Sequence, residues 1–149
     1  MELTVLLCTD GSELALNALA AGMAVLGQPD RVVIATVVEA VDPTLLTGTG
    51  MAAGVMSPQD FEQLEADRET ESRAVLEATR TALGLTDAET IVVAGSPGHS
   101  LCELAEELPA SVIVLGTRGR GGIRRAVLGS VSDHVVRNAP CPVLTTGAS

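Results

Sequence analysis

The residues best suited to chemistry in this chain are glycines at fixed spacing between an apolar run and a predicted helix. Gly116 and Gly119 are followed, after nine residues, by Gly129 and Ser130. The apolar run at 112–115 predicts a buried strand, and a helix is predicted to begin at Ser130. Glycine permits a close approach to backbone N–H groups, and the N-terminus of a helix favours negative charge. This arrangement predicts an anion site, with a nucleotide as the expected ligand.

The start of the predicted helix also has a purely structural interpretation. Ser130 with Asp133 three residues later fits a variant of the capping box, which needs no ligand. A bare helix terminus contributes only about 0.3–1 kcal/mol to anion binding, so several donors must converge on a phosphate chain. Besides the Ser130 hydroxyl, such donors are available from Arg118, Gly119 and Gly129, which favours phosphate binding.

A second candidate group, Asp10-Gly11-Ser12, closes the predicted N-terminal strand. These residue types are typical of a turn followed by a helix N-cap. Alternatively, the Asp10 carboxylate accepts hydrogen bonds from ribose hydroxyls or helps to hold a divalent cation. The segment alone leaves both interpretations open.

The charge of the chain limits the classes of ligand. A formal net charge of −10 argues against nonspecific binding to nucleic acid or to an anionic membrane. The chain has no lysine, which excludes a Walker A lysine and a lysine Schiff base. Because Phe61 is its single aromatic residue, an adenine pocket would be aliphatic and lined by backbone. A local positive patch that suits a small anion comes from Arg118, Arg120, Arg124 and Arg125.

Five short apolar runs, rich in β-branched residues, predict parallel strands that are covered on both faces. They are Leu3–Cys8, Val32–Val38, Thr90–Ala94, Val112–Leu115 and Val143–Thr146. Helical patterns begin near Ser12, after Ser96-Pro97 and at Ser130, and a long acidic helix with one solvated face is predicted over 60–83. The stretch at 40–58 is predicted to be irregular, and a surface connection is favoured there over a flap above the ligand.

This alternation predicts a doubly wound α/β fold, with one parallel sheet and helices on both faces. Ligands bind to such sheets beyond the carboxyl ends of the strands, where the strand order reverses. If the first and fourth strands are neighbours there, Asp10 and Gly116 meet in one cleft. The length of 149 residues is that of a single domain, 1–149.

Other features point to a cytoplasmic protein with no membrane or nucleic-acid partner. No apolar run is long enough to span a membrane, and no basic segment precedes the first strand. Cys8, Cys102 and Cys141 lack metal or disulfide spacing, so we expect buried thiols. His99 and His134 are expected to be ordinary helix residues.

On these residues, the chain resembles the UspA family of universal stress proteins over essentially its whole length. The resemblance is carried by Thr9-Asp10-Gly11-Ser12, Gly95-x-Pro97, the segment 112–122, Gly129-Ser130-Val131-Ser132 and Ala139-Pro140-Cys141-Pro142-Val143-Leu144. The ATP-binding subgroup is marked by G-x2-G-x9-G-[ST], which is complete here. The resemblance implies a five-stranded parallel sheet and a homodimer through the last strand, Val143–Thr146. Ser111 departs from the family, which usually has Asp there, but it lies at the start of a strand and away from the expected pocket.

The resemblance also implies the roles of individual residues. Asp10 would contact the ribose or its metal, and the backbone around Val37 would meet adenine. The implied nucleotide-binding residues are Thr9, Asp10, Val37, Leu115, Gly116, Arg118, Gly119, Gly129, Ser130, Val131 and Ser132, of which Gly116, Arg118, Gly119 and 129–132 would wrap the phosphates. The expected cofactor is ATP, or AMP or ADP, with Mg²⁺ as a candidate metal.

Three functions remain open at this point. The first is an ATP-binding regulatory protein of stress adaptation with weak or no hydrolysis. The second is a slow ATPase that uses Asp10 and a divalent metal, although no second carboxylate or histidine is evidently near. The third is a dimeric interaction protein that binds no nucleotide, against which the complete glycine pattern argues.

Overall fold

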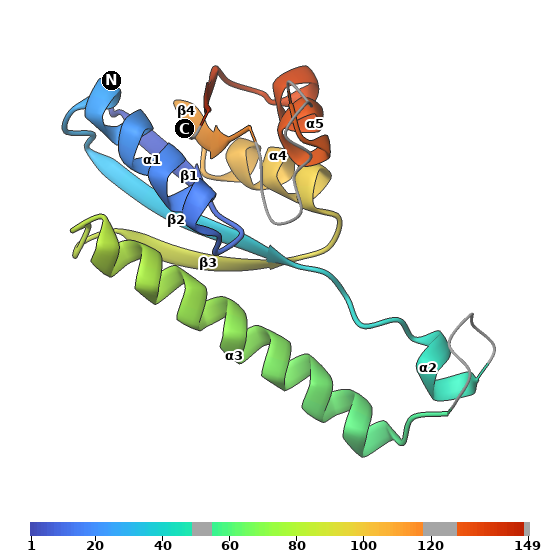
Figure 1. Ribbon diagram of the computed structural model, residues 1–149. Helices are drawn as coiled ribbons and strands as arrows, with labels where there is room; N and C mark the ends of the chain where they lie inside the picture. Colours follow the sequence, from blue (N-terminus) through green and yellow to red (C-terminus); the bar gives the residue numbers. More distant parts are fainter. Residues whose placement is uncertain (49–54, 118–127, 148–149) are drawn as a thin grey trace.

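A computed structural model describes residues 1–48, 55–117 and 128–147 of the chain. Five strands form one parallel sheet in the order β3-β2-β1-β4-β5, with helices on both faces (Figure 1). The predicted doubly wound α/β fold is thus confirmed, and each predicted strand is present to within one residue at either end. The strands are β1 (Thr4–Cys8), β2 (Arg31–Val38), β3 (Glu89–Ala94), β4 (Val112–Gly116) and β5 (Val143–Thr146).

The helices follow the predicted pattern with one addition. They are α1 (Glu13–Leu26), α2 (Thr44–Thr47), α3 (Pro58–Ala82), α4 (Pro97–Glu107) and α5 (Ser130–Asn138). The stretch at 40–58 was predicted to be irregular, but it contains the short helix α2. Asp42 accounts for this turn: its carboxylate accepts hydrogen bonds from the backbone N–H and the hydroxyl of Thr44, at 2.9 and 2.7 Å.

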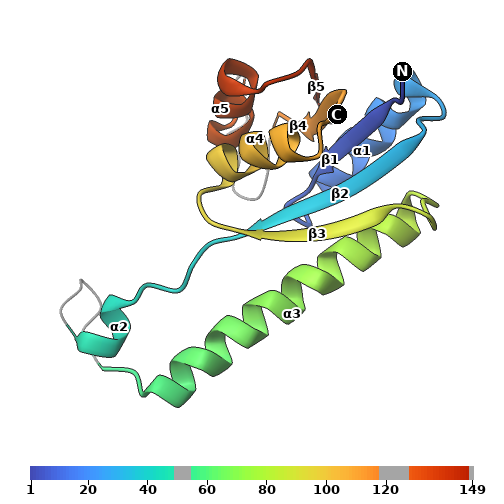
Figure 2. The ribbon, with the colours of Figure 1, turned by 180° about the vertical axis from the view of Figure 1, so that it is seen from behind.

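The sheet separates two apolar clusters, and alternate residues of β1 contribute to each. Leu6 and Cys8 pack with α4 and α5, whereas Val5 and Leu7 pack with α1 and α3. This period of two is the expected pattern for a strand that is covered on both faces. The two views in Figures 1 and 2 show the two helical layers on opposite sides of the sheet.

Helix α1 lies very close to β4 because small residues line its inner face. Ala15, Ala18 and Gly22 are all buried there. A Cβ atom at Gly22 would overlap the side chain of Val114, so the close approach requires glycine at this position. The Thr146 hydroxyl donates a hydrogen bond to the Ala18 carbonyl at 2.7 Å, which ties the same helix to β5.

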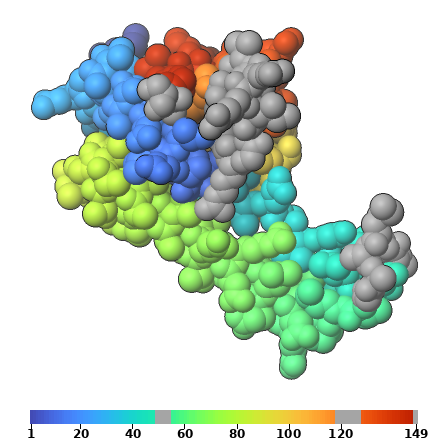
Figure 3. Space-filling view, in the orientation of Figure 1, coloured from blue at the N-terminus to red at the C-terminus, as the bar shows by residue number. Residues whose placement is uncertain are grey.

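Helix α2 and the N-terminal half of α3 project from the body of the sheet, as Figures 1 and 2 show. Figure 3 shows this projection as a lobe apart from the rest. The predicted solvated face of the long helix is confirmed, since most of its carboxylates are exposed. Two of them form surface ion pairs along the helix, Arg73 with Glu69 and Arg80 with Glu77. Among the described helices, none is both long and apolar enough to cross a membrane.

Candidate nucleotide-binding site

The first and fourth strands are neighbours at the point where the strand order reverses, as the proposed cleft requires. Val5, Leu6 and Leu7 of β1 pair with Val112, Ile113 and Val114 of β4. The next elements along the chain, α1 and α5, pack on opposite faces of the sheet. The turn after β1 and the end of β4 therefore meet at the carboxyl edge of the sheet, which is where open α/β sheets bind ligands.

The turn after β1 is held by its own side chains. The Thr9 hydroxyl accepts a hydrogen bond from the Gly11 N–H at 3.1 Å, and the Asp10 carboxylate accepts one from the Ser12 N–H at 2.9 Å. Gly11 has a φ of 81°, a conformation that favours glycine. Thr9 is buried and Asp10 is exposed. The structure thus supports the turn and cap interpretation of this segment and leaves the Asp10 side chain at the surface of the edge.

The end of β4 and the start of α5 meet at the Thr117 carbonyl. This oxygen accepts a hydrogen bond from the Gly129 N–H at 2.7 Å, and the Ser132 hydroxyl lies 3.3 Å from it. The Thr117 N–H donates to the Thr146 carbonyl at the end of β5, at 3.2 Å. Thr117 therefore joins two strands to the first turn of α5. Its residue type gives no signal of this role, because the role depends on a backbone carbonyl.

The N-cap of α5 is Gly129, not Ser130 as the capping-box pattern predicted. Ser130 is already the first residue of the helix, because the Asp133 N–H bonds to the Gly129 carbonyl at 2.9 Å. Glycine has no side chain to cap the helix, and the backbone N–H groups of residues 130–132 have no partner among the described residues. These three amides point along the helix toward its N-terminus, as first-turn amides do, which makes the start of α5 a place where an anion can be held.

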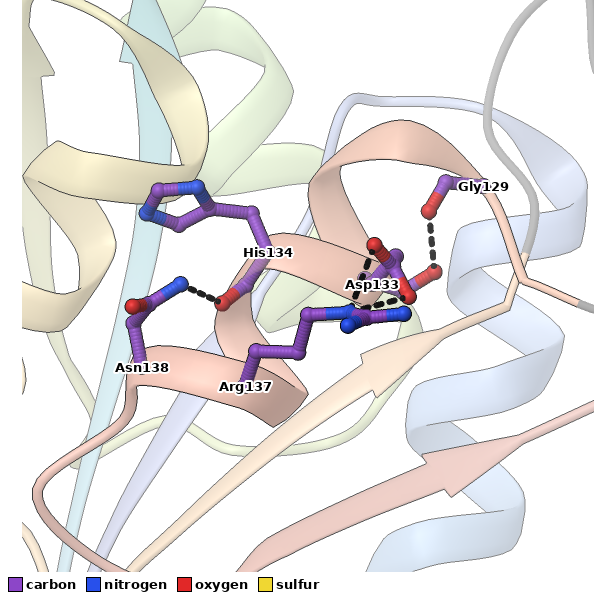
Figure 4. Close-up of polar contacts among 6 residues, drawn as sticks. Gly129, Asp133, His134, Arg137 and Asn138 are labelled. Atoms are coloured by element: carbon purple, nitrogen blue, oxygen red, sulfur yellow. Dashed lines mark hydrogen bonds and ion pairs between the residues drawn. The ribbon is translucent and has the colours of Figure 1, made fainter.

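Charges around the first turn of α5 are partly balanced within the helix. Figure 4 shows Arg137 paired with Asp133, with Nε at 3.0 and 3.1 Å from the two carboxylate oxygens. The same view shows the Asn138 amide bonded to the His134 carbonyl one turn away. Arg137 therefore offsets the negative charge of Asp133, the acidic residue in the first turn of α5.

The remaining predicted residues lie along the same edge or outside the described ranges. Val37 is half-buried near the end of β2, where it pairs with Val93 of β3, and Leu115 is buried near the end of β4. Gly116 is the last residue of β4, and Val131 packs against the cluster beneath α4 and α5. Arg118 and Gly119 fall in the range 118–127, outside the described residues, as do the other three arginines of the predicted patch.

The cysteines and histidines form no reactive centre in the described part of the chain. The three cysteines are free thiols, with Cys8 and Cys102 buried and Cys141 half-buried, close to the prediction. Burial raises the pKa of the Cys8 thiol far above its usual range, so this thiol is a poor nucleophile. No group of three or more metal-ligating side chains occurs among the described residues.

The departure at Ser111 has a structural role far from the site. Its hydroxyl accepts a hydrogen bond from the Thr4 N–H at 3.0 Å and donates one to the Glu2 carbonyl at 3.1 Å. These contacts lie at the amino ends of β1 and β4. The prediction that this residue lies at the start of the strand is therefore confirmed, and the proposed pocket lies at the opposite end of the same strand.

Comparisons with known proteins agree on one family. The model of the family described as "Universal stress protein family" matches residues 1–146. The chain is 32% identical over 143 residues to the universal stress protein YxiE of Bacillus subtilis, covering 94% of this chain and 95% of that one. It is 46% identical to the universal stress protein MJ0531 of Methanocaldococcus jannaschii over 55 residues, which is 37% of this chain and 32% of that protein.

Solved structures show the same fold. The hypothetical protein MJ0577 superposes with a TM-score of 0.74 at 18% identity, over 100% of this chain and 98% of that one. A universal stress protein in complex with cAMP has a TM-score of 0.63 at 26% identity, over 99% and 98%. The Arabidopsis thaliana family member At3g01520, with AMP bound, has a TM-score of 0.61 at 16% identity, over 99% and 92%.

Proposed function

Because the chain belongs to the universal stress protein family, we propose that it is a regulatory protein that binds an adenine nucleotide, with ATP as its ligand. The observation that carries the proposal is the glycine-capped start of α5, whose three first-turn amides have no partner among the described residues. A related protein at 26% identity is described in complex with cAMP, which supports an adenine nucleotide as the ligand class.

In this proposal, the phosphates lie against the first turn of α5. The N–H groups of Ser130, Val131 and Ser132 and the exposed Ser130 hydroxyl donate to the phosphate oxygens. Arg118 and Gly119 complete the phosphate site by the spacing of the sequence pattern. Gly116 at the end of β4 leaves room for the nucleotide to approach the backbone.

The nucleoside part lies toward β1 and β2. Asp10 is exposed beside the turn that follows β1, where its carboxylate accepts hydrogen bonds from the ribose hydroxyls. Thr9 directly follows β1, and Val37 and Leu115 lie in the adjacent strands β2 and β4; together they provide an aliphatic wall and backbone groups for adenine. Mg²⁺, which prefers oxygen ligands and binds through few protein carboxylates, fits Asp10 together with the phosphate oxygens of the nucleotide.

In this proposal, the protein hydrolyses ATP slowly or not at all. Phosphoryl transfer to water requires a group that positions the water. Among the residues of the proposed site, Asp10 is the carboxylate offered for that task, whereas Asp133 is paired with Arg137. We therefore expect the nucleotide to act as a bound signal.

The proposed assembly is a homodimer through β5. All four residues of this edge strand are half-buried in the single chain, and their outer backbone groups have no neighbouring strand among the described residues. An exposed strand edge is a surface on which another chain can pair. A second copy that pairs along Val143–Thr146 would cover it.

Isothermal titration calorimetry of the purified protein with ATP and AMP tests the proposal, alongside mass spectrometry of any small molecule released on denaturation. Saturable ATP binding with a 1:1 ratio is expected, and multiple turnovers are not. Turnover that disappears in Asp10→Ala would establish the slow ATPase instead. Absence of binding at millimolar ATP would refute the nucleotide site and leave a protein that acts through its dimer surface.

A further inference from the structure

We infer that Ser132 is a positioning residue, whose hydroxyl holds the first turn of α5 against the end of β4 and thereby keeps the amides of that turn in place for a phosphate. The inference rests on the proposed nucleotide site and identifies the side chain that keeps this site in shape. The family resemblance places Ser132 among the residues that wrap the phosphates. The inference leaves its backbone N–H in that role and assigns its hydroxyl to the junction between β4 and α5.

The Ser132 side chain faces the protein. The residue is 3% exposed, and its hydroxyl oxygen lies 3.0 Å from the Gly129 carbonyl and 3.3 Å from the Thr117 carbonyl. A serine hydroxyl carries one proton, so this proton is shared between two backbone acceptors. Ser130, two residues earlier, is exposed, and its hydroxyl makes no hydrogen bond to the described residues. The two serines of the pattern therefore have different tasks.

The two acceptors of Ser132 belong to the two segments that must be held together. Thr117 follows β4, and Gly129 is the N-cap of α5, twelve positions further along the chain. The Gly129 N–H already bonds to the Thr117 carbonyl at 2.7 Å, and the hydroxyl adds a second tie to the same oxygen. Without the hydroxyl, the Gly129 N–H is the remaining hydrogen bond between these segments in the described part of the chain.

The position of the first turn matters because phosphate binding needs several amides at once. Hydrogen bonds from N–H groups to phosphate oxygens weaken steeply when their geometry departs from the optimum. A helix start that moves relative to β4 must be ordered when the ligand binds, and this ordering reduces affinity. A buried hydroxyl that fixes the junction in the free protein lowers that cost.

The test compares Ser132→Ala with Ser132→Thr, which keeps the hydroxyl, and with Ser130→Ala as the matched exposed serine. Two quantities are measured for each variant: the dissociation constant for ATP by calorimetry, and the hydrogen-exchange rate of the Gly129 amide in the nucleotide-free protein by NMR. The exchange rate reports the junction directly, because this amide donates to the Thr117 carbonyl.

Ser132→Ala is expected to weaken ATP binding by about five- to tenfold, the change that corresponds to one lost hydrogen bond. It is also expected to accelerate exchange at Gly129, and Ser132→Thr is expected to retain slow exchange and tight binding. Ser130→Ala should leave the exchange rate unchanged.

Three outcomes separate the hypotheses. If Ser132→Ala binds ATP as the unaltered protein does, the inference is wrong while the nucleotide site stands. If affinity falls with unchanged exchange at Gly129, the Ser132 hydroxyl contacts the ligand directly and the inference is again wrong. If the unaltered protein binds no ATP, the proposed function fails, and with it the positioning role that rests on it.

Discussion

Two helices of this protein begin at the same edge of the sheet, and their first turns are finished in opposite ways. The Ser12 hydroxyl caps α1 by accepting a hydrogen bond from the Ala15 N–H at 3.1 Å. The preceding turn is closed in the same manner by Thr9 and Asp10. Helix α5 has Gly129 at its N-cap and no side-chain cap.

The comparison shows that topology alone does not decide whether the first turn of a helix is capped by a side chain. Both helices follow a parallel strand, and both carry an acidic residue in the first turn. At α1, the cap residue accepts a hydrogen bond from one first-turn donor, the Ala15 N–H, whereas at α5 the cap residue has no side chain to do so. In the proposed function, the phosphates lie at the uncapped start of α5 and not at the capped start of α1.

The largest effect is expected from closing α5 in the way that α1 is closed. In Gly129→Ser, the new hydroxyl can accept a hydrogen bond from a first-turn amide, which removes a donor from the phosphate. The new Cβ atom would also lie 3.0 Å from the Thr117 carbonyl oxygen, so the junction must shift slightly. We expect ATP affinity to fall at least thirtyfold, or about 2 kcal/mol, measured by calorimetry.

Gly147→Ala is the matched control for this change. Its new Cβ atom would lie 3.9 Å from the Thr117 hydroxyl, which is an ordinary contact beside the same residue. ATP affinity should stay within about twofold of the unaltered protein, as for other surface substitutions. Tight ATP binding by Gly129→Ser would show that the uncapped amides are not the phosphate site.

An effect of intermediate size is expected from opening α1. Ser12→Ala removes the cap and should cost about 1 kcal/mol of unfolding free energy, which lowers Tm by about 2–4 °C in a protein of this size. ATP affinity should hardly change, since the α1 amides are not proposed to bind phosphate. Differential scanning calorimetry and ATP titration measure the two quantities. A loss of affinity comparable to that of Gly129→Ser would contradict the distinction between the two helix starts.

The smallest effect concerns the charge in the first turn of α5. Arg137→Ala leaves the Asp133 carboxylate without its ion-pair partner. ATP affinity should fall by about two- to threefold, because a side-chain charge and a phosphate charge roughly 8 Å apart interact by about 0.5 kcal/mol in water. Asp133→Asn should instead raise ATP affinity. Both effects should fade at high ionic strength, where such charges are screened. The ATP affinity of both variants is measured by titration at low and high salt. A change of affinity that is the same in both variants would rule out an electrostatic origin.

Much of the fold could be predicted from the sequence because it depends on local periodicity. The five strands are continuous apolar runs, and the helices between them show the spacing of one apolar face. Residues with a strong local preference, such as Pro97 at the start of α4, indicate closely where a helix begins. Helix α2 was not predicted, since its four residues are too few to show a period.

The candidate site was predicted less completely. The glycine spacing pointed to the segment, but the capping-box pattern placed the N-cap of α5 at Ser130, and neither pattern gave a role to Thr117. A serine before a helical pattern and a serine within its first turn look alike in sequence. In the structure, the Gly129 N–H and the Ser132 hydroxyl bond to the carbonyl of Thr117, which follows β4. These contacts, which the sequence does not show, distinguish a serine before the helix from a serine within its first turn.

The sequence by itself determined which segments become strands and helices, and it determined that glycines and serines follow β4. These features depend on neighbouring residues along the chain, whose preferences act locally. The tertiary structure decided that β1 and β4 lie side by side, that Gly129 is the N-cap of α5, and that Ser132 turns its hydroxyl inward. The physical reason is that a hydrogen bond forms only when donor and acceptor lie within about 3 Å of each other, and the folded chain determines which acceptor is that close.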